Sequence, residues 1–201
     1  MASSISKPLD YAAYLKLPET MRRYDIVEGV LRFLSPGPDI AHQEILRRIF
    51  LLLDGHVEKH DLGEVYFAPL DVIITKVPLH TRQPDLMYIS NTRRYILQDQ
   101  VCGGPDLVVE VLSPGNPLKR VQEKLRAYAS VEVREAWVVD PKQKTVAVLH
   151  LRQREFLETA VFGAGRRLRS KVLPRLALPV GRIFTEQESD AGAPEPVDRE
   201  R

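Results

Sequence analysis

The chain has 201 residues and a mass of 22.9 kDa, which suits one domain with tails and excludes two full enzyme domains. Its hydrophobic share of 44% is enough for a sizeable core, and its formal charge is only +2. The longest uninterrupted apolar run, Ile49–Leu53, is far below the roughly 18 to 20 residues of a bilayer span, and the N-terminus lacks an apolar signal core. We therefore expect a soluble, cytoplasmic protein with no membrane partner.

The cysteine content and the charge distribution limit the kinds of site and partner that the protein can have. Cys102 is the only cysteine, so an internal disulfide is excluded, and it forms no zinc-ligand spacing with the five histidines. Residues 186–201 contain six acids and two arginines, so the rest of the chain holds 27 basic and 21 acidic residues, a formal charge of +6. This mildly basic body suits an anionic partner without requiring one.

The first part of the chain predicts a short helix, a hairpin and a long helix. After a flexible N-terminus over 1–8, Asp10 can cap a helix that runs to residue 17. The segment 24–34 has the pattern of two strands around a turn at Glu28-Gly29, an N-terminal β-hairpin. Apolar residues then recur at helical spacing, which predicts a helix over 39–58.

The rest of the chain alternates between strand patterns and one more helix. Short apolar runs predict strands over 64–68, 71–75, 85–90, 106–112, 136–139, 145–149 and 155–161. A helix is expected over 117–130, with Pro117 at its start. The prediction is an α/β (α+β) domain over 9–185, a mixed β-sheet flanked by helices, followed by a disordered acidic tail over 186–201.

The most informative position is Glu110, which interrupts the apolar strand Leu107–Leu112. A strand of this composition is expected to be buried on both faces. A carboxylate there costs several kcal/mol unless it is paired, protonated or bound to a cation. Either a structural salt bridge or a functional site can supply that compensation.

Asp85 is the second carboxylate of interest. It follows Gln83-Pro84 and opens an apolar run, so it stands at the start of a strand with its backbone restricted by the proline. Alone it could serve as a turn or cap residue. Two inward acids on adjacent strands, however, form an oxygen-ligand pair for Mg²⁺ that leaves room for water and a substrate phosphate.

Lys124 is the candidate for a cationic partner. Residue 112 shares a side of the strand with Glu110 and is a leucine, so no lysine stands two places after the glutamate. On the following helix Lys124 borders the apolar stripe that includes Val121 and Tyr128. It can either extend along the surface into solvent or reach over the sheet to Glu110.

Five strings taken together resemble the Uma-type putative restriction endonuclease family, a bacterial branch of the PD-(D/E)XK nuclease superfamily. They are 24–45, Gln83-Pro84-Asp85, 103–116 (GGPDLVVEVLSPGN), 123–129 (EKLRAYA) and 135–141 (EAWVVDP). The resemblance spans about residues 10 to 184, and the combination is more specific than any single piece. It implies a restriction-endonuclease-like sheet flanked by helices.

The resemblance also implies roles for single residues. Asp85 and Glu110 would hold Mg²⁺, or Mn²⁺, with the backbone carbonyl of Val111, and Lys124 would replace the strand lysine of the superfamily. His42 and Glu44 at the entry of the first long helix, and Tyr128, are further candidates. A histidine near a helix start can equally cap the helix or satisfy the core, and Glu44 can be solvated.

Three departures from the family pattern bear on activity. Arg120 stands where the family usually has an aspartate, Leu112 replaces the superfamily's strand lysine, and the segment Glu135-Ala136-Trp137 lacks the usual tyrosine. Elsewhere, Ser113 lacks a nucleophile-elbow context and the chain has no phosphate-binding glycine loop. Basic clusters at 93–94 and 166–169 could meet a phosphate backbone or simply be solvated.

The function predicted from the sequence is metal-dependent endonucleolytic hydrolysis of nucleic acid, with DNA as the expected partner and a homodimer as a possible assembly. The alternative is a catalytically impaired nuclease-fold module that binds DNA or protein, which Arg120 and Leu112 favour. A third hypothesis is that the protein is a hydrolase that acts on a small phosphate ester. The sequence identifies no recognition site for bases.

Overall fold

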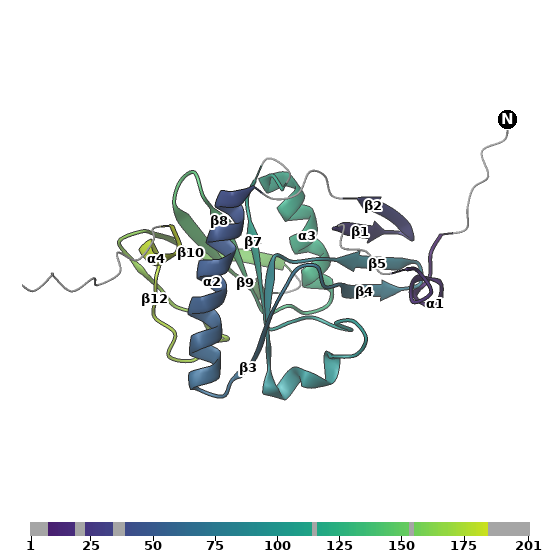
Figure 1. Cartoon of the computed structure of the whole chain (residues 1–201), viewed down its shortest axis with the longest axis horizontal. Helices are drawn as coiled ribbons and strands as arrows, with labels where there is room; N and C mark the ends of the chain where they lie inside the picture. Colours follow the sequence, from purple (N-terminus) through teal and green to yellow (C-terminus); the bar gives the residue numbers. More distant parts are fainter. Residues whose placement is uncertain (1–7, 19–22, 34–38, 114–115, 153–154, 185–201) are drawn as a thin grey trace, which may run out of the picture.

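Two sheets of unequal size organise the chain in the computed structural model, which describes residues 8–18, 23–33, 39–113, 116–152 and 155–184 (Figure 1). The larger sheet has the strand order β10-β9-β8-β7-β6-β3. Only β7 and β8 run parallel, whereas the other neighbours pair antiparallel. Its strands are β3 (Gly63–Phe67), β6 (Leu86–Ser90), β7 (Leu107–Val111), β8 (Glu135–Asp140), β9 (Thr145–Arg152) and β10 (Glu155–Gly163). The predicted mixed sheet is confirmed.

The smaller sheet has the order β2-β1-β5-β4. Its strands are β1 (Tyr24–Val27), β2 (Val30–Phe33), β4 (Val72–Lys76) and β5 (Leu79–Arg82). The predicted hairpin is confirmed, and its turn places Glu28 and Gly29 at φ 51° and 74°. A short helix, α1 (Tyr11–Tyr14), precedes it with Asp10 as its N-cap, and it ends earlier than the predicted residue 17. Strand β5 was not predicted.

Two long helices cover opposite faces of the larger sheet. Helix α2 (Ile40–Lys59) begins at its N-cap Asp39 and packs through Ile45, Ile49 and Leu53 against one face. Helix α3 (Leu118–Ser130) packs against the other face, and Pro117 is its N-cap rather than its first residue. Side chains of β7 alternate between the two cores, as expected for a strand buried on both faces.

The C-terminal part adds to the core beside α2. A short pair of strands, β11 (Arg167–Leu168) and β12 (Leu178–Pro179), and helix α4 (Gly181–Phe184) contribute Leu168 and Ile183 to that core. A 3-10 helix, η1 (Asn91–Ile96), follows β6. These elements were not predicted. The boundaries proposed for the two tails stay predictions, because residues 1–7 and 185–201 lie outside the described part of the chain.

The two sheets are joined by a very short connection. Strand β5 of the smaller sheet ends at Arg82, and strand β6 of the larger sheet begins at Leu86. Only Gln83, Pro84 and Asp85 lie between them. None of the helices in the described residues combines the length and apolar character that a membrane crossing requires.

Candidate active site

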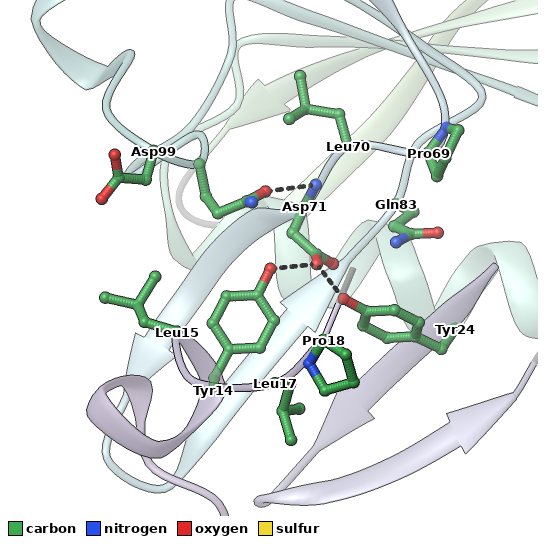
Figure 2. A pocket seen from close by; sticks show the side chains of 11 residues that line it. Tyr14, Leu15, Leu17, Pro18, Tyr24, Pro69, Leu70, Asp71, Gln83 and Asp99 are labelled. Carbon is green, nitrogen blue, oxygen red and sulfur yellow. Dashed lines mark hydrogen bonds between the residues drawn. The ribbon is translucent and has the colours of Figure 1, made fainter. Parts of the chain in front are cut away.

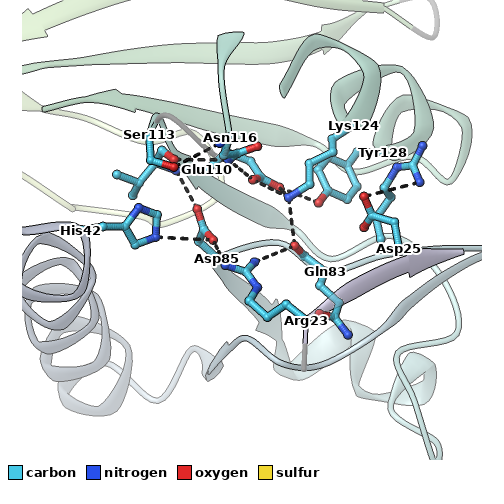
Figure 3. Close-up of polar contacts among 12 residues, drawn as sticks. Arg23, Asp25, His42, Gln83, Asp85, Glu110, Ser113, Asn116, Lys124 and Tyr128 are labelled. Carbon is cyan, nitrogen blue, oxygen red and sulfur yellow. Dashed lines mark hydrogen bonds and ion pairs between the residues drawn. The ribbon is translucent and has the colours of Figure 1, made fainter. Parts of the chain in front are cut away.

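Glu110 lies near the end of β7 on the face that α3 covers, and its side chain is completely buried. Its carboxylate accepts hydrogen bonds from Lys124 Nζ at 2.7 and 2.9 Å, from Tyr128 Oη at 2.7 Å and from Asn116 Nδ2 at 3.1 Å (Figure 3). The cost of burying this charge is therefore offset by one ion pair and two neutral donors. This compensation is compatible with either of the two alternatives, a structural salt bridge or a functional site.

Asp85 stands at the same end of the sheet because β6 begins where the antiparallel β7 ends. Its backbone N–H donates to the carbonyl of Val109 at 3.1 Å. Its carboxylate Oδ2 accepts from the backbone N–H of Val111 at 2.8 Å, and Oδ1 accepts from an Arg23 guanidinium nitrogen at 2.8 Å. The two acids thus occupy adjacent strands, and Asp85 binds the peptide group that follows Glu110.

Lys124 extends from α3 over the end of the sheet. Its ammonium group donates to both carboxylate oxygens of Glu110 and to the backbone carbonyl of Gln83 at 3.0 Å. The residue is only 2% exposed, so the alternative that it extends along the surface into solvent is wrong. Because the Gln83 carbonyl lies two residues before Asp85, this amine ties together the three segments that carry the candidate residues.

The electrostatic environment shifts the pKa values of the Asp85 and Glu110 carboxyl groups in opposite directions. Burial acts to raise the pKa of Asp85, but His42, Lys124 and Arg23 together hold it well below its ordinary value. Burial raises the pKa of Glu110, and the Asp85 charge adds to this against the opposing effect of Lys124. Asp85 is therefore the more readily ionised of the two acids, and Glu110 is the more readily protonated.

His42 and Glu44 have different surroundings. His42 is 4% exposed, its Nε2 lies 3.7 Å from Asp85 Oδ1, and neither ring nitrogen makes a hydrogen bond to the described residues. Its backbone N–H completes the cap of α2 at Asp39. Glu44 instead forms an ion pair with Arg48 at 3.3 Å one helical turn away. The structure brings His42 to Asp85 and places Glu44 in a separate contact.

The donor chemistry of this cluster fits a hard divalent cation. Asp85 and Glu110 supply carboxylate oxygens, and the adjacent Val111 carbonyl already accepts from Asn116 at 3.2 Å. No group of three or more His, Cys, Asp or Glu side chains able to hold a metal exists within the described ranges. Mg²⁺ usually takes one or two protein carboxylates and completes its shell with water, so two acids and a carbonyl are sufficient.

Three members of the cluster had no role assigned from the sequence. Arg23 binds both Asp85 and the Gln83 carbonyl, the latter at 3.2 Å, and Asn116 donates to Glu110 and Val111. Gln83 supplies the carbonyl shared by Arg23 and Lys124. Gln83 and Asn116 do lie within the strings that carry the resemblance, which was the available signal. For Arg23 the sequence gave no signal, since 62 positions separate it from Asp85.

Comparison with known proteins decides the family. The model of the Uma2 family, described as putative restriction endonuclease, matches residues 11–181. The chain belongs to the Uma2 family. The resemblance inferred from the sequence is thereby confirmed, and Uma2 membership supports a nuclease function.

A solved structure shares the fold of this Uma2 protein. The crystal structure of a putative nuclease belonging to DUF820 from Anabaena variabilis superposes with a TM-score of 0.72 and 22% sequence identity. The similarity covers 88% of this chain and 98% of the other. A search of curated proteins gave no match.

The departures from the Uma2 pattern noted above have clear positions in the fold. Leu112 follows β7 and packs at the edge of the core beneath α3. Trp137 of β8 is fully buried and donates through Nε1 to Glu135 at 2.8 Å. Arg120 lies in the first turn of α3, one turn before Lys124. Leu112 and Arg120 therefore lie on the α3 side of the sheet, as Glu110 does, whereas Trp137 packs in the core beside α2.

Proposed function

We propose that this Uma2 protein is a metal-dependent endonuclease that hydrolyses DNA phosphodiester bonds. The observation that supports it is the convergence of Asp85, Glu110 and Lys124 on the end of two adjacent strands, with Lys124 Nζ 2.7 Å from Glu110. Two oxygen ligands beside a fixed amine match the requirements of phosphodiester hydrolysis. Family membership supports the nuclease class, and the basic body suits a polyanionic substrate.

In this proposal Asp85 and Glu110, with the Val111 carbonyl, hold Mg²⁺ or Mn²⁺. The ion would polarise the scissile phosphate and lower the pKa of a coordinated water. Lys124 Nζ is held in place by Glu110 and the Gln83 carbonyl. Its positive charge would therefore stabilise the negative charge that develops on the phosphate, and the lysine side chain would not have to move to do so. Tyr128 orients Glu110 through its hydroxyl.

Arg23 controls the approach to the acids. Asp85 and Glu110 are 1% and 0% exposed, whereas the Arg23 side chain is 20% exposed. Its guanidinium occupies Asp85 Oδ1, an atom that the proposed cation would use. We infer that Arg23 turns away from Asp85 when metal and substrate bind and then contacts the phosphate backbone, which its planar fork of donors suits.

The decisive test is incubation of the purified full chain with supercoiled plasmid and Mg²⁺ or Mn²⁺, with and without chelator. We expect the wild type to nick or linearise DNA only with metal, and Asp85→Asn and Glu110→Gln to be nearly inactive. Lys124→Met should cleave about two to three powers of ten more slowly, as for loss of other preorganised electrostatic donors. Glu44→Gln serves as the matched carboxylate control and should retain activity. If the wild type and Asp85→Asn gave equal amounts of cleaved plasmid, the result would contradict the proposal.

A non-catalytic DNA- or protein-binding module is the second candidate. One observation favours it: Arg23 and Lys124 already balance the charges of Asp85 and Glu110 without a metal. If the protein retains DNA at low salt but cleaves it with none of the metals, this result would support the binding module. If it hydrolyses a small phosphate ester and does not retain DNA, this result would instead support the hypothesis of a small phosphate ester hydrolase.

A further inference from the structure

A polar cavity adjoins the candidate active site through Gln83. It has a volume of about 720 Å³ and opens between α1, β1 and the segments that flank β4. This volume is within the range of cavities that bind small organic groups. Its lining includes Tyr14, Leu15, Tyr24, Pro69, Asp71 and Gln83 (Figure 2).

Asp71 is the buried acid of this cavity and is only 2% exposed. Its Oδ2 accepts hydrogen bonds from the hydroxyls of Tyr14 at 2.7 Å and Tyr24 at 3.0 Å. Its Oδ1 and the Oε1 of Gln83, which is also 2% exposed, complete no hydrogen bond in the described residues, although the side chains of Thr81 and Gln83 lie close enough to Asp71 to oppose the rise in its pKa that burial causes. Buried acceptor oxygens whose hydrogen bonding is incomplete are costly unless a ligand supplies further donors.

The chemistry of the cavity selects its ligand. Unpaired acceptors and a buried carboxylate repel phosphate and favour a group with N–H donors. The tyrosine rings and the leucine and proline side chains suit a flat, largely apolar body. Adenine, cytosine and guanine combine such a body with an exocyclic amino group, whereas thymine has a single N–H between two carbonyls that Asp71 would repel.

Gln83 connects the cavity to the candidate active site. Its side chain lines the cavity, while its backbone carbonyl accepts from Lys124 at 3.0 Å and from Arg23 at 3.2 Å. Resting on the function proposed above, we propose that this cavity binds a nucleobase with an exocyclic amino group, adjacent to the phosphate that is cleaved. Asp71 and Gln83 read its amino edge, and Tyr14 and Tyr24 hold Asp71 in place. A base in this cavity would be turned out of the helical stack, which brings its edge within reach of side chains.

Nucleoside binding to the full chain tests the cavity without any cleavage. Ligand-observed NMR titration compares adenosine with purine riboside, which differs only in lacking the amino group, and cytidine with thymidine. We expect the amino-bearing member of each pair to bind about tenfold more tightly, the scale of one good hydrogen-bonded edge. Equal affinities within each pair, or no binding at about 10 mM, would overturn the assignment.

Variants add a second, independent readout. Asp71→Asn should abolish the preference of adenosine over purine riboside, because the carboxylate acceptor is lost. Glu58→Gln removes a charge from the exposed surface of α2, outside the residues that line the cavity, and should keep the preference. If Asp71→Asn does not fold, judged by circular dichroism, the wild-type nucleoside pairs still decide the question, because they need no variant.

Sequencing the ends of DNA cleaved from a random pool links the cavity to the reaction. We expect an amino-bearing base to be enriched at one fixed position beside the cut, and Asp71→Asn to lose that enrichment. Cleavage without base enrichment or nucleoside preference overturns the cavity assignment and leaves the proposed function intact. Amino-dependent nucleoside binding by a protein that cleaves nothing overturns the proposed function alone.

Discussion

Glu110 and Lys124 illustrate how a buried charge is held in this protein. The glutamate lies on a strand of Val and Leu residues and would be strongly unfavourable alone, yet its carboxylate receives four hydrogen bonds from three side chains. Lys124 in turn depends on Glu110 and the Gln83 carbonyl for its own compensation. Each charge is therefore tolerated because of the other, and loss of one is expected to cost more than loss of both.

This dependence predicts the outcome of a double-mutant cycle. Lys124→Met should lower the free energy of unfolding by about 3 to 5 kcal/mol, the usual cost of leaving one charge of a buried pair. The double variant Glu110→Gln/Lys124→Met should lose clearly less than the sum of the two single variants. Urea denaturation at pH 7 measures both. Lys119→Met, an exposed position on the same helix, is the control and should change stability little.

Asp71 predicts a pH dependence of stability. Burial raises its pKa above the ordinary 3.8, against the hydrogen bonds of Tyr14 and Tyr24, so the folded protein holds this proton more tightly than the unfolded chain. Its contribution is full below pH 3.8 and is lost as pH rises through the raised pKa of the folded state. The denaturation midpoint of the wild type, measured from pH 3 upward and expressed relative to that of Asp71→Asn at the same pH, should therefore decline as pH rises. The same pH dependence in both proteins would contradict the raised pKa of Asp71.

The sequence predicted Asp85, Glu110 and Lys124 as neighbours, whereas Arg23 and the Asp71 cavity could not be predicted. Glu110 and Lys124 stand in a strand and a helix whose periodicity indicates their faces, Asp85 directly precedes a strongly apolar strand, and the family resemblance implied that the three act together. Arg23 reaches Asp85 only because the smaller sheet packs beside the larger one, a long-range relation that no local pattern encodes. The roles assigned to these residues stay predictions until variants are measured.

At the scale of elements, the long and strongly patterned segments were predicted best. Helix α2 was expected over 39–58 and spans Ile40–Lys59, and α3 differs from its expected bounds by one residue. Strand β5 was missed because it has only four residues, of which Leu79 is the only apolar one. The elements after β10 were missed because they are too short to show a period, and their stability depends on packing against α2.

Two glycines allow a prediction about turn and helix. Gly29 has φ +74°, and a Cβ there would lie 2.5 Å from Pro8 Cβ, so Gly29→Ala should destabilise the protein by at least about 1 to 2 kcal/mol. Gly55 lies inside α2, and a Cβ at this position would meet no described atom within 4 Å, so Gly55→Ala should stabilise the protein by about 0.5 to 1 kcal/mol. Thermal or urea unfolding measures both. Equal effects of the two substitutions would contradict the assigned backbone conformations.

At the scale of the whole molecule, charge is divided between the body and the C-terminal segment. Residues 186–201 lower the formal charge from +6 to +2. If DNA is the substrate, removal of this segment should increase DNA affinity several-fold at about 50 mM salt, and the gain should shrink as salt is raised. Fluorescence anisotropy with a labelled duplex measures the change. A gain that is independent of salt would show that charge is not its cause.

The three-residue link between β5 and β6 has a consequence for how such a protein can diversify. Gln83 lines the cavity, Asp85 belongs to the proposed metal site, and Pro84 is the single residue between them. Helix α1 and the segment around Asp99 contribute to the cavity alone. Residues of α1 and of the segment around Asp99 can therefore change during evolution and alter which ligand the cavity binds. An insertion within the link, in contrast, would move both the cavity residue Gln83 and the proposed metal ligand Asp85. Relatives should therefore vary in what they recognise while keeping this tripeptide at constant length.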